Sequence, residues 1–227
     1  MNRKTVRTRT DGTHVHLPVP VTDPDIFRHD ATASILHLLT DNPDRAFSNR
    51  QLHRLTGKGM GNVNGAVNSL ENVGLVTINR EGRSNQIEIN ATKLYKPDDL
   101  ITLVPQTEFQ QPIREVVTRL VENVGSDIGV ILFGSVARGD ADRASDVDLF
   151  VVVPENRMAA QRKAHTIEKE IASDRFGGDR YEFHIVVEAQ ESAPKHDRIS
   201  DVLTEGITLR ASAALDAVKQ EVFENGA

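Results

Sequence analysis

The stretch that decides the fold reads ILFGSVARG at residues 131–139 and SDVDL at residues 145–149. An apolar run ends at a glycine and a serine, and a second apolar run soon begins with two aspartates one residue apart. In a β-strand, residues i and i+2 point to the same face of the sheet. The pattern therefore predicts two strands, with Asp146 and Asp148 together on one face and their apolar neighbours in a core.

This arrangement favours a divalent cation and a phosphate group. Two neighbouring carboxylates repel each other unless a cation lies between them, and Mg²⁺ binds through one or two carboxylates together with substrate phosphates. A glycine turn at Gly134 lets backbone N–H groups approach a phosphate closely, and the hydroxyl of Ser135 offers one more donor. We therefore expect metal at Asp146 and Asp148, and phosphate at Gly134 and Ser135.

Three short motifs carry a resemblance to a known superfamily. They read GS at residues 134–135, RGD at residues 138–140 and SDVD at residues 145–148. In this form the sequence resembles the minimal members of the DNA polymerase β-like nucleotidyltransferases, over roughly residues 109–210. The whole chain is similar to archaeal, haloarchaeal-like proteins that join a winged helix to such a domain.

The resemblance implies Mg²⁺-dependent or Mn²⁺-dependent transfer of a nucleoside monophosphate from an NTP, expected to be ATP, to a hydroxyl. It also implies a third metal-binding acid on a neighbouring strand. Here that acid is Glu182, where the superfamily commonly has an aspartate. His184 shares its face, either as a partner of the metal ligands or as an ordinary strand residue. Arg138 either contacts phosphate or lies on the surface.

The acceptor stays open at this point. A protein side chain, an RNA 3′ end and a small molecule are all compatible, and the resemblance to nucleotidyltransferases of toxin–antitoxin pairs favours a protein or tRNA. Two other classes of function compete with the enzyme. One is a DNA-binding transcriptional regulator whose second domain binds nucleotide without turnover. The other is an antitoxin-like protein whose second domain holds a partner.

Composition and charge exclude several classes of protein. The chain has 227 residues, of which only 4% are aromatic, so we expect a core of Val, Ile and Leu. Its net charge of −6 indicates that its surface as a whole does not attract nucleic acid. It contains no cysteine, which excludes disulfides, thiolate metal sites and a cysteine nucleophile. Polar residues follow the first methionine, and no apolar run is long enough to span a membrane. These features predict a soluble, cytoplasmic protein.

The sequence predicts a mixed α+β or α/β chain of two domains. We expect a basic, proline-containing N-terminal tail at residues 1–28, a winged helix-turn-helix at residues 29–95 and a linker at residues 96–108. A nucleotidyltransferase domain with a mixed sheet flanked by helices then covers residues 109–227. The tail is either mobile, an arm on nucleic acid or a strand that packs on a partner chain.

Local signals support the first domain. Apolar spacing predicts a helix over about residues 30–40, and Ser48 is a typical N-cap for a short helix that ends near Gly57. A third helix runs from Met60 to about Val73. Two short apolar runs, at residues 75–78 and 86–89, then predict a hairpin.

The third helix is the candidate DNA-binding element. Asn62, Asn64 and Asn68 are expected on its outer face, where asparagine can pair with adenine edges or phosphates. Lys58 and Arg83 would contact the DNA backbone. Residues 30–95 carry seven Lys/Arg against six Asp/Glu, a net charge of about +1. Strong DNA binding usually requires several positive charges to neutralise phosphates, so this balance supports it only weakly. DNA binding, protein docking and a structural role therefore stay open, and paired half-sites would suit a homodimer.

The second domain is expected to contain the following elements. A helix begins near Pro112 and ends at Gly125, strands cover residues 128–133, 146–153 and 181–187, and helices cover residues 157–175, 197–205 and the end of the chain from 212. In the helix that begins at residue 157, the predicted inward residues are Met158, Ala164, Ile167 and Ile171.

Overall fold

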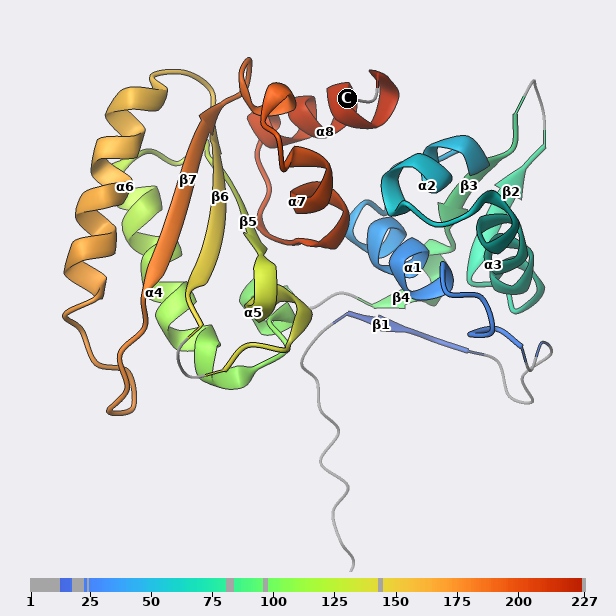
Figure 1. Cartoon of the computed structure of the whole chain (residues 1–227), viewed down its shortest axis with the longest axis horizontal. Helices are drawn as coiled ribbons and strands as arrows, with labels where there is room; N and C mark the ends of the chain where they lie inside the picture. Colours follow the sequence, from blue (N-terminus) through green and yellow to red (C-terminus); the bar gives the residue numbers. More distant parts are fainter. Residues whose placement is uncertain are drawn as a thin grey trace, which may run out of the picture.

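The computed structural model of the chain describes residues 13–17, 23, 25–80, 84–95, 98–142 and 145–225. A small helical unit, the N-terminal unit, lies beside a larger α/β unit, the C-terminal unit (Figure 1). Among the residues described, no helix is both long enough and apolar enough to cross a membrane.

The N-terminal unit is built from three helices and a hairpin. These are α1 (Thr32–Asp41), α2 (Asn49–Thr56), α3 (Met60–Asn72), β2 (Val76–Asn79) and β3 (Gln86–Ile89). The cap of α2 is reciprocal, since the Ser48 hydroxyl accepts from the Gln51 N–H at 3.2 Å and the Gln51 side chain accepts from the Ser48 N–H at 2.8 Å. The elements occur in the predicted order. Their assignment to the winged helix-turn-helix class stays a prediction.

Part of the predicted N-terminal tail pairs with its own chain. Strand β1 (His14–Val15) lies antiparallel to β4 (Leu94–Tyr95), which follows the hairpin. Residues 14 and 15 therefore extend the N-terminal unit instead of standing free of it. The basic residues before them, at positions 3 to 9, lie outside the described part of the chain.

A mixed four-stranded sheet forms the centre of the C-terminal unit. Its strands are β5 (Gly129–Phe133), β6 (Val147–Val153), β7 (Phe183–Ala189) and β8 (Ile207–Arg210), in the order β7-β6-β5-β8. β5 is antiparallel to β6 and to β8, whereas β6 and β7 are parallel. Helices cover both faces of the sheet, which explains why β5 and β6 read as nearly continuous apolar runs.

The helices divide between the two faces. α4 (Gln110–Asn123) and α6 (Arg157–Ile171) cover one face, while α7 (Ile199–Glu205) and α8 (Ala213–Asn225) cover the other (Figure 1). The short helix α5 (Gly134–Arg138) follows β5 directly. Because α7 and α8 lie between the sheet and the N-terminal unit, they connect the two units physically.

Two predictions about the C-terminal unit need correction. The helix predicted over residues 157–175 ends at Ile171, because the chain turns there toward β7. Met158 was expected to point inward with Ala164 and Ile167, but its side chain is 73% exposed. Only the last two of these three residues are buried.

The predicted linker contributes to a core. Two short 3₁₀ helices, η2 (Leu100–Leu103) and η3 (Thr107–Phe109), occupy much of residues 96–108. Ile101 and Val104 are buried in the same apolar cluster as α4 and α6. This segment therefore packs as part of the C-terminal unit.

One apolar cluster extends across the seam between the units. It contains α1 residues such as Leu38, α7 and α8 residues such as Leu203 and Phe223, and Phe150 from the sheet. The ring of Phe47 meets that of Phe223 edge to face, with centroids 5.2 Å apart. The two units thus share a core.

A buried ion pair fixes the same seam. The ammonium of Lys219 lies 3.1 Å from the carboxylate of Asp41, and the two side chains are only 6% and 9% exposed. The Thr208 hydroxyl donates to Asp41 at 2.7 Å, and Lys219 donates to that hydroxyl at 3.0 Å. Asp41 is the last residue of α1, where the helix dipole disfavours a negative charge, so Lys219 supplies the compensation.

Removing one partner of this pair should be costly. We expect Lys219→Met to lower the free energy of unfolding by about 3–5 kcal/mol, because it leaves the Asp41 charge buried without its cationic partner. The exposed control Lys169→Met should change that free energy by less than about 0.5 kcal/mol. Chemical denaturation of the full chain measures both, and Asp41→Leu combined with Lys219→Met should recover part of the loss. If Lys219→Met lowers the free energy of unfolding as little as Lys169→Met does, the buried ion pair does not stabilise the seam.

Candidate active site

Strands β5 and β6 bring the two sequence motifs together at one end of the sheet. Phe133, the last residue of β5, pairs with Asp148 in the antiparallel register. Gly134 follows at once and begins α5. The turn and the second aspartate of the motif therefore meet at the same place on neighbouring strands.

Gly134 cannot be replaced by another residue without disturbing Asp148. Its φ of +76° lies in the left-handed region that favours glycine. A Cβ built on Gly134 would collide with Oδ2 of Asp148. The glycine thus lets the carboxylate lie directly over the backbone of the turn, a close approach that any side chain at this position would prevent.

The surroundings of Asp148 act on its pKa in both directions. Burial raises the pKa of Asp148 above its ordinary value, and the negative charge of Asp146 adds to the rise. His184, Arg198 and Arg138 act in the opposite direction and lower this pKa in part. Burial is the largest of these effects. Asp146 itself lies just before β6 and is exposed, so the two acids differ in their access to water.

The third acid lies at the edge of this arrangement. His184 on β7 pairs with Asp148 in the parallel register. Glu182 is exposed and lies one residue before β7, where its carbonyl accepts a hydrogen bond from the Val147 N–H at 2.9 Å. In the described part of the chain, no three His, Cys, Asp or Glu side chains are gathered closely enough to hold a metal ion. The assignment of Asp146, Asp148 and Glu182 to one metal site therefore stays a prediction.

Helix α5 carries the predicted phosphate-binding residues. Ser135 is half-buried in its first turn, and its carbonyl accepts from the Asp140 N–H at 3.1 Å. Arg138, at the end of α5, donates to Asp140 at 3.3 Å and is about half exposed. An anion that binds to Arg138 would have to compete with this exposed ion pair, which is a weak competitor.

Sequence reasoning missed Arg198. It lies immediately before α7, and its guanidinium carbon is 5.2 Å from the centre of the Phe133 ring. The same charge acts on Asp148, which follows from the pairing of Phe133 with Asp148. No local motif surrounds Arg198, so only the packing of α7 against β5 identifies it as a neighbour of the site.

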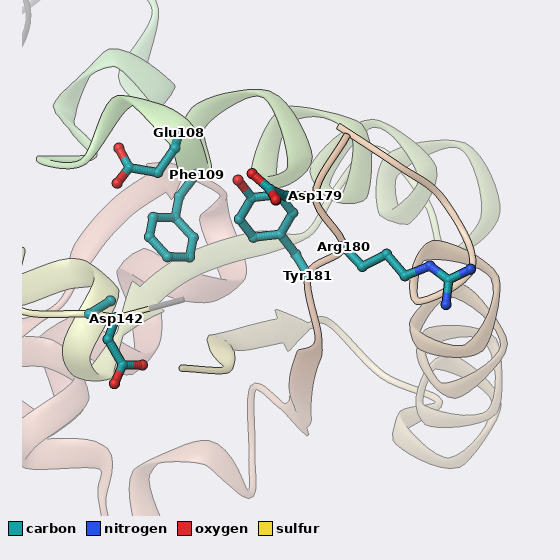
Figure 2. A pocket seen from close by; sticks show the side chains of 7 residues that line it. Glu108, Phe109, Asp142, Asp179, Arg180 and Tyr181 are labelled. Atoms are coloured by element: carbon teal, nitrogen blue, oxygen red, sulfur yellow. The ribbon is translucent and has the colours of Figure 1, made fainter. Parts of the chain in front are cut away.

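A cavity of about 390 Å³ adjoins the Glu182 side of this site. Its lining includes Asp142, which follows α5, and Asp179 to Tyr181, which precede Glu182. The rings of Phe109 and Tyr181 meet edge to face at 5.3 Å. In Figure 2, Arg180 points away from Glu108 and Asp142. The cavity therefore combines aromatic and acidic walls.

The predicted DNA-binding residues are separated from this site. Asn62, Asn64 and Asn68 are all exposed on α3, but residues two apart on a helix do not share a face, so only Asn64 and Asn68 form a pair. The Asn64 side chain accepts a hydrogen bond from Asn49 at 2.8 Å. Lys58 lies 3.6 Å from Asp30, and Arg83 is outside the described residues.

A comparison with protein families covers the region just described. Residues 113–207 match the family model for the nucleotidyltransferase domain. This part of the C-terminal unit is thus similar to nucleotidyltransferase domains. The match includes Gly134, Ser135, Asp146, Asp148 and Glu182, and it agrees at this level with the resemblance seen in the sequence. Neither the curated proteins nor the solved structures gave a significant match to the chain.

The raised pKa of Asp148 has a consequence for stability. Because the folded protein holds this proton more firmly than the unfolded chain, ionisation of Asp148 opposes folding. This loss of stability is absent below the ordinary pKa of aspartate, where the carboxyl is protonated in both states. It develops as the pH rises through the raised pKa of the folded protein and persists at neutral pH. We therefore expect Asp148→Asn to raise the melting temperature at pH 7 in EDTA, with the gain shrinking toward pH 4.

Thermal unfolding of both proteins across this pH range tests the expectation. The exposed control Asp127→Asn should leave the melting temperature nearly unchanged throughout. A melting temperature of Asp148→Asn below that of the unaltered protein at pH 7 would show that His184 and the two arginines outweigh the burial.

Proposed function

We propose that this protein is a Mg²⁺-dependent nucleotidyltransferase that moves a nucleoside monophosphate from an NTP to a hydroxyl acceptor. The observation that carries the proposal is the carboxylate of Asp148 lying over Gly134, where β5 turns into α5. The match of residues 113–207 to the nucleotidyltransferase domain supports the same reaction class. ATP is the donor that we propose, and Mn²⁺ is an alternative metal.

The donor's triphosphate would lie against the start of α5. Backbone N–H groups around Gly134 and the hydroxyl of Ser135 would bind phosphate oxygens, since the absence of a side chain at Gly134 leaves the backbone accessible. Arg138 and Arg198 would add positive charge on the side of Asp148. These groups orient the triphosphate and stabilise the negative charge that develops on it, which is usually the main catalytic contribution.

Asp146 and Asp148 are the residues that would hold the metal. Their pairing fits Mg²⁺, which takes one or two carboxylates and completes its coordination with phosphate oxygens and water. Burial and the charge of Asp146 raise the pKa of Asp148, and a bound cation would offset both effects by stabilising the ionised carboxylate. Glu182, from the segment before β7, is proposed as the third acid. When bound, Mg²⁺ would neutralise phosphate charge and lower the pKa of the acceptor hydroxyl.

The proposed reaction is a single displacement at the α-phosphorus of the NTP. The acceptor oxygen forms a bond to the α-phosphorus, the bond from that phosphorus to the bridging oxygen breaks, and pyrophosphate leaves. The proton of the acceptor hydroxyl passes to solvent. Because Glu182 would hold the metal that activates the acceptor, the acceptor should approach from the side of the cavity in Figure 2. The proposed acceptor classes are a protein side chain, an RNA 3′ end and a small molecule.

Transfer of label tests the proposal directly. The full chain, incubated with Mg²⁺, NTPs labelled at the α-phosphate and cell extract, should label an acceptor. Asp146→Asn combined with Asp148→Asn should reduce labelling at least about 100-fold, since it removes the proposed metal-binding pair. The double control Asp127→Asn with Glu155→Gln, both exposed acids outside the site, should label normally.

Two outcomes would count against the enzyme. Labelling that survives the change of Asp146 and Asp148 would refute the assigned site. Nucleotide binding without any labelling would favour the alternative, a regulator or antitoxin-like protein whose second domain binds nucleotide or a partner without turnover.

We also propose that the N-terminal unit directs the enzyme to DNA. The exposed pair of Asn64 and Asn68 supports this, as does the position of α3 on the side of the N-terminal unit that faces away from the sheet (Figure 1). Asn62, Lys58 and Arg83 belong to the same proposal as flanking contacts. A homodimer on paired half-sites would suit this use of the unit.

Mobility-shift measurements with the full chain test DNA binding. The protein should retard DNA from the region upstream of its own gene at low salt. Asn64→Asp combined with Asn68→Asp should weaken binding about tenfold or more, because the new charges repel phosphate. The exposed control pair Gln111→Glu and Gln190→Glu, which adds the same charge elsewhere, should have little effect. Absence of retardation at low salt would rule out this role.

A further inference from the structure

A second cavity lies in the seam between the two units. Its volume is about 520 Å³. Helices α1 and α2 of the N-terminal unit form one wall, and helices α5 and α7 of the C-terminal unit form the other. The family match covers residues 113–207, so it includes only the second of these walls.

This cavity shares the short helix α5 with the candidate active site. Ala137 and Arg138, which line it, end the same short helix that begins at Gly134. Along the axis of α5, Gly134 and Arg138 are roughly 6 Å apart, given the rise of an α-helix. On the other wall, Ser200 and Asp201 follow soon after Arg198, whose charge acts on Asp148. A ligand whose phosphates lie at Gly134 could therefore extend into the seam.

Contacts between the units hold the walls in place. His37 on α1 donates from Nε2 to the carbonyl of Gly206 at 2.9 Å, at the end of α7. Arg54 on α2 donates to the carbonyl of Phe223 at 2.9 Å. Together with the Lys219–Asp41 pair, these bonds fix the cavity before any ligand arrives. A preformed cavity is the usual form of a small-molecule site.

The chemistry of the lining suits a nucleoside. Asp201 and Glu205 lie one turn apart on the same face of α7, and both are exposed. Carboxylates of this kind accept hydrogen bonds from ribose hydroxyls. Because Nε2 of His37 donates to a carbonyl, its Nδ1 is an acceptor in the neutral ring and can receive an N–H from a base. The guanidinium plane of Arg54 offers a stacking surface.

The lining is less suited to the phosphates themselves. Two arginines, Arg54 and Arg138, are balanced by two acids, Asp201 and Glu205, so a polyphosphate inside the cavity would face both negative charges. Arg138 lies on the wall that leads to Gly134. The charges thus favour phosphates at the Arg138 end and an uncharged sugar and base beyond it.

We propose that the seam cavity binds the nucleoside portion of the donor nucleotide, so that α1 and α2 complete the nucleotide site of the C-terminal unit. This inference rests on the proposed function, because it takes the phosphates to lie at Gly134 and Ser135. It gives the N-terminal unit a part in substrate binding that is independent of DNA. The cavity of Figure 2 is then left for the acceptor.

The test fills the cavity from the N-terminal unit. Ala33 is exposed on α1 and lines the cavity, so Ala33→Trp places a large ring in it without entering the core. The control is Ala172→Trp, at an exposed position after α6. Calorimetric titration of each full chain with Mg²⁺ and a non-hydrolysable NTP, and separately with Mg²⁺ and tripolyphosphate, distinguishes the nucleoside from the phosphates. Thermal unfolding confirms that each variant is folded.

We expect Ala33→Trp to weaken binding of the NTP analogue about tenfold or more while tripolyphosphate binding stays within about twofold. Ala172→Trp should change neither affinity. If Ala33→Trp leaves the analogue's affinity unchanged, or weakens tripolyphosphate equally, the inference is wrong although the proposed function stands. The same holds if Ala172→Trp has an equal effect. If the unaltered protein binds neither ligand, the proposed function fails and this inference fails with it.

A second pair of changes tests the sugar contact. Asp201→Asn combined with Glu205→Gln should reduce the preference for a ribonucleotide analogue over its 2′-deoxy form by about tenfold, since hydrogen bonds to charged groups are lost. Tripolyphosphate binding should not fall. An unchanged preference, or no preference in the unaltered protein, would overturn the assignment of these acids to the ribose.

Discussion

The site depends on a single steric constraint, the passage of the Asp148 carboxylate over the backbone of Gly134. The antiparallel pairing of β5 with β6 brings these two residues together, and the left-handed φ of Gly134 turns the chain into α5 at that point. Because this close approach partly buries Asp148, the acid is costly to ionise until positive charge reaches it. Arg138 at the end of α5 and Arg198 before α7 both carry positive charge that partly lowers the pKa of Asp148.

The second organising feature is the seam between the units. A fusion of two independent modules would leave a polar boundary joined by a linker. Here the boundary contains a shared apolar cluster, an edge-to-face pair of rings and a buried ion pair. Helix α7 belongs to both the active site and the seam. Arg198, just before α7, lies near the active site, and Gly206, just after it, accepts the hydrogen bond from His37. One short helix therefore contacts both α1 and the neighbourhood of Asp148.

Sequence reasoning succeeded where the signal was local. The N-cap at Ser48, the hairpin and the two strands that meet at the aspartate motif all follow from spacing within a few residues. It failed where the decisive partner is remote. The local sequence predicts Lys219 to be a surface residue of a helix. Nothing near it in the sequence indicates that it is buried in an ion pair with Asp41. Arg198 has no motif, and Met158 is apolar on an exposed helical face. The seam cavity requires four helices from distant parts of the chain, so periodicity could not reveal it.

The pairing of Asp41 with Lys219 joins residues separated by 178 positions. During synthesis the helices of the N-terminal unit leave the ribosome long before α8, which begins at Ala213. α1 and α2 pack on α3 within the N-terminal unit, but their contacts with α7 and α8 close a long loop, and contacts between residues so far apart in the sequence form slowly. The apolar surfaces that meet in the seam are therefore expected to be among the last to be buried during folding, and apolar surface exposed during that interval favours aggregation.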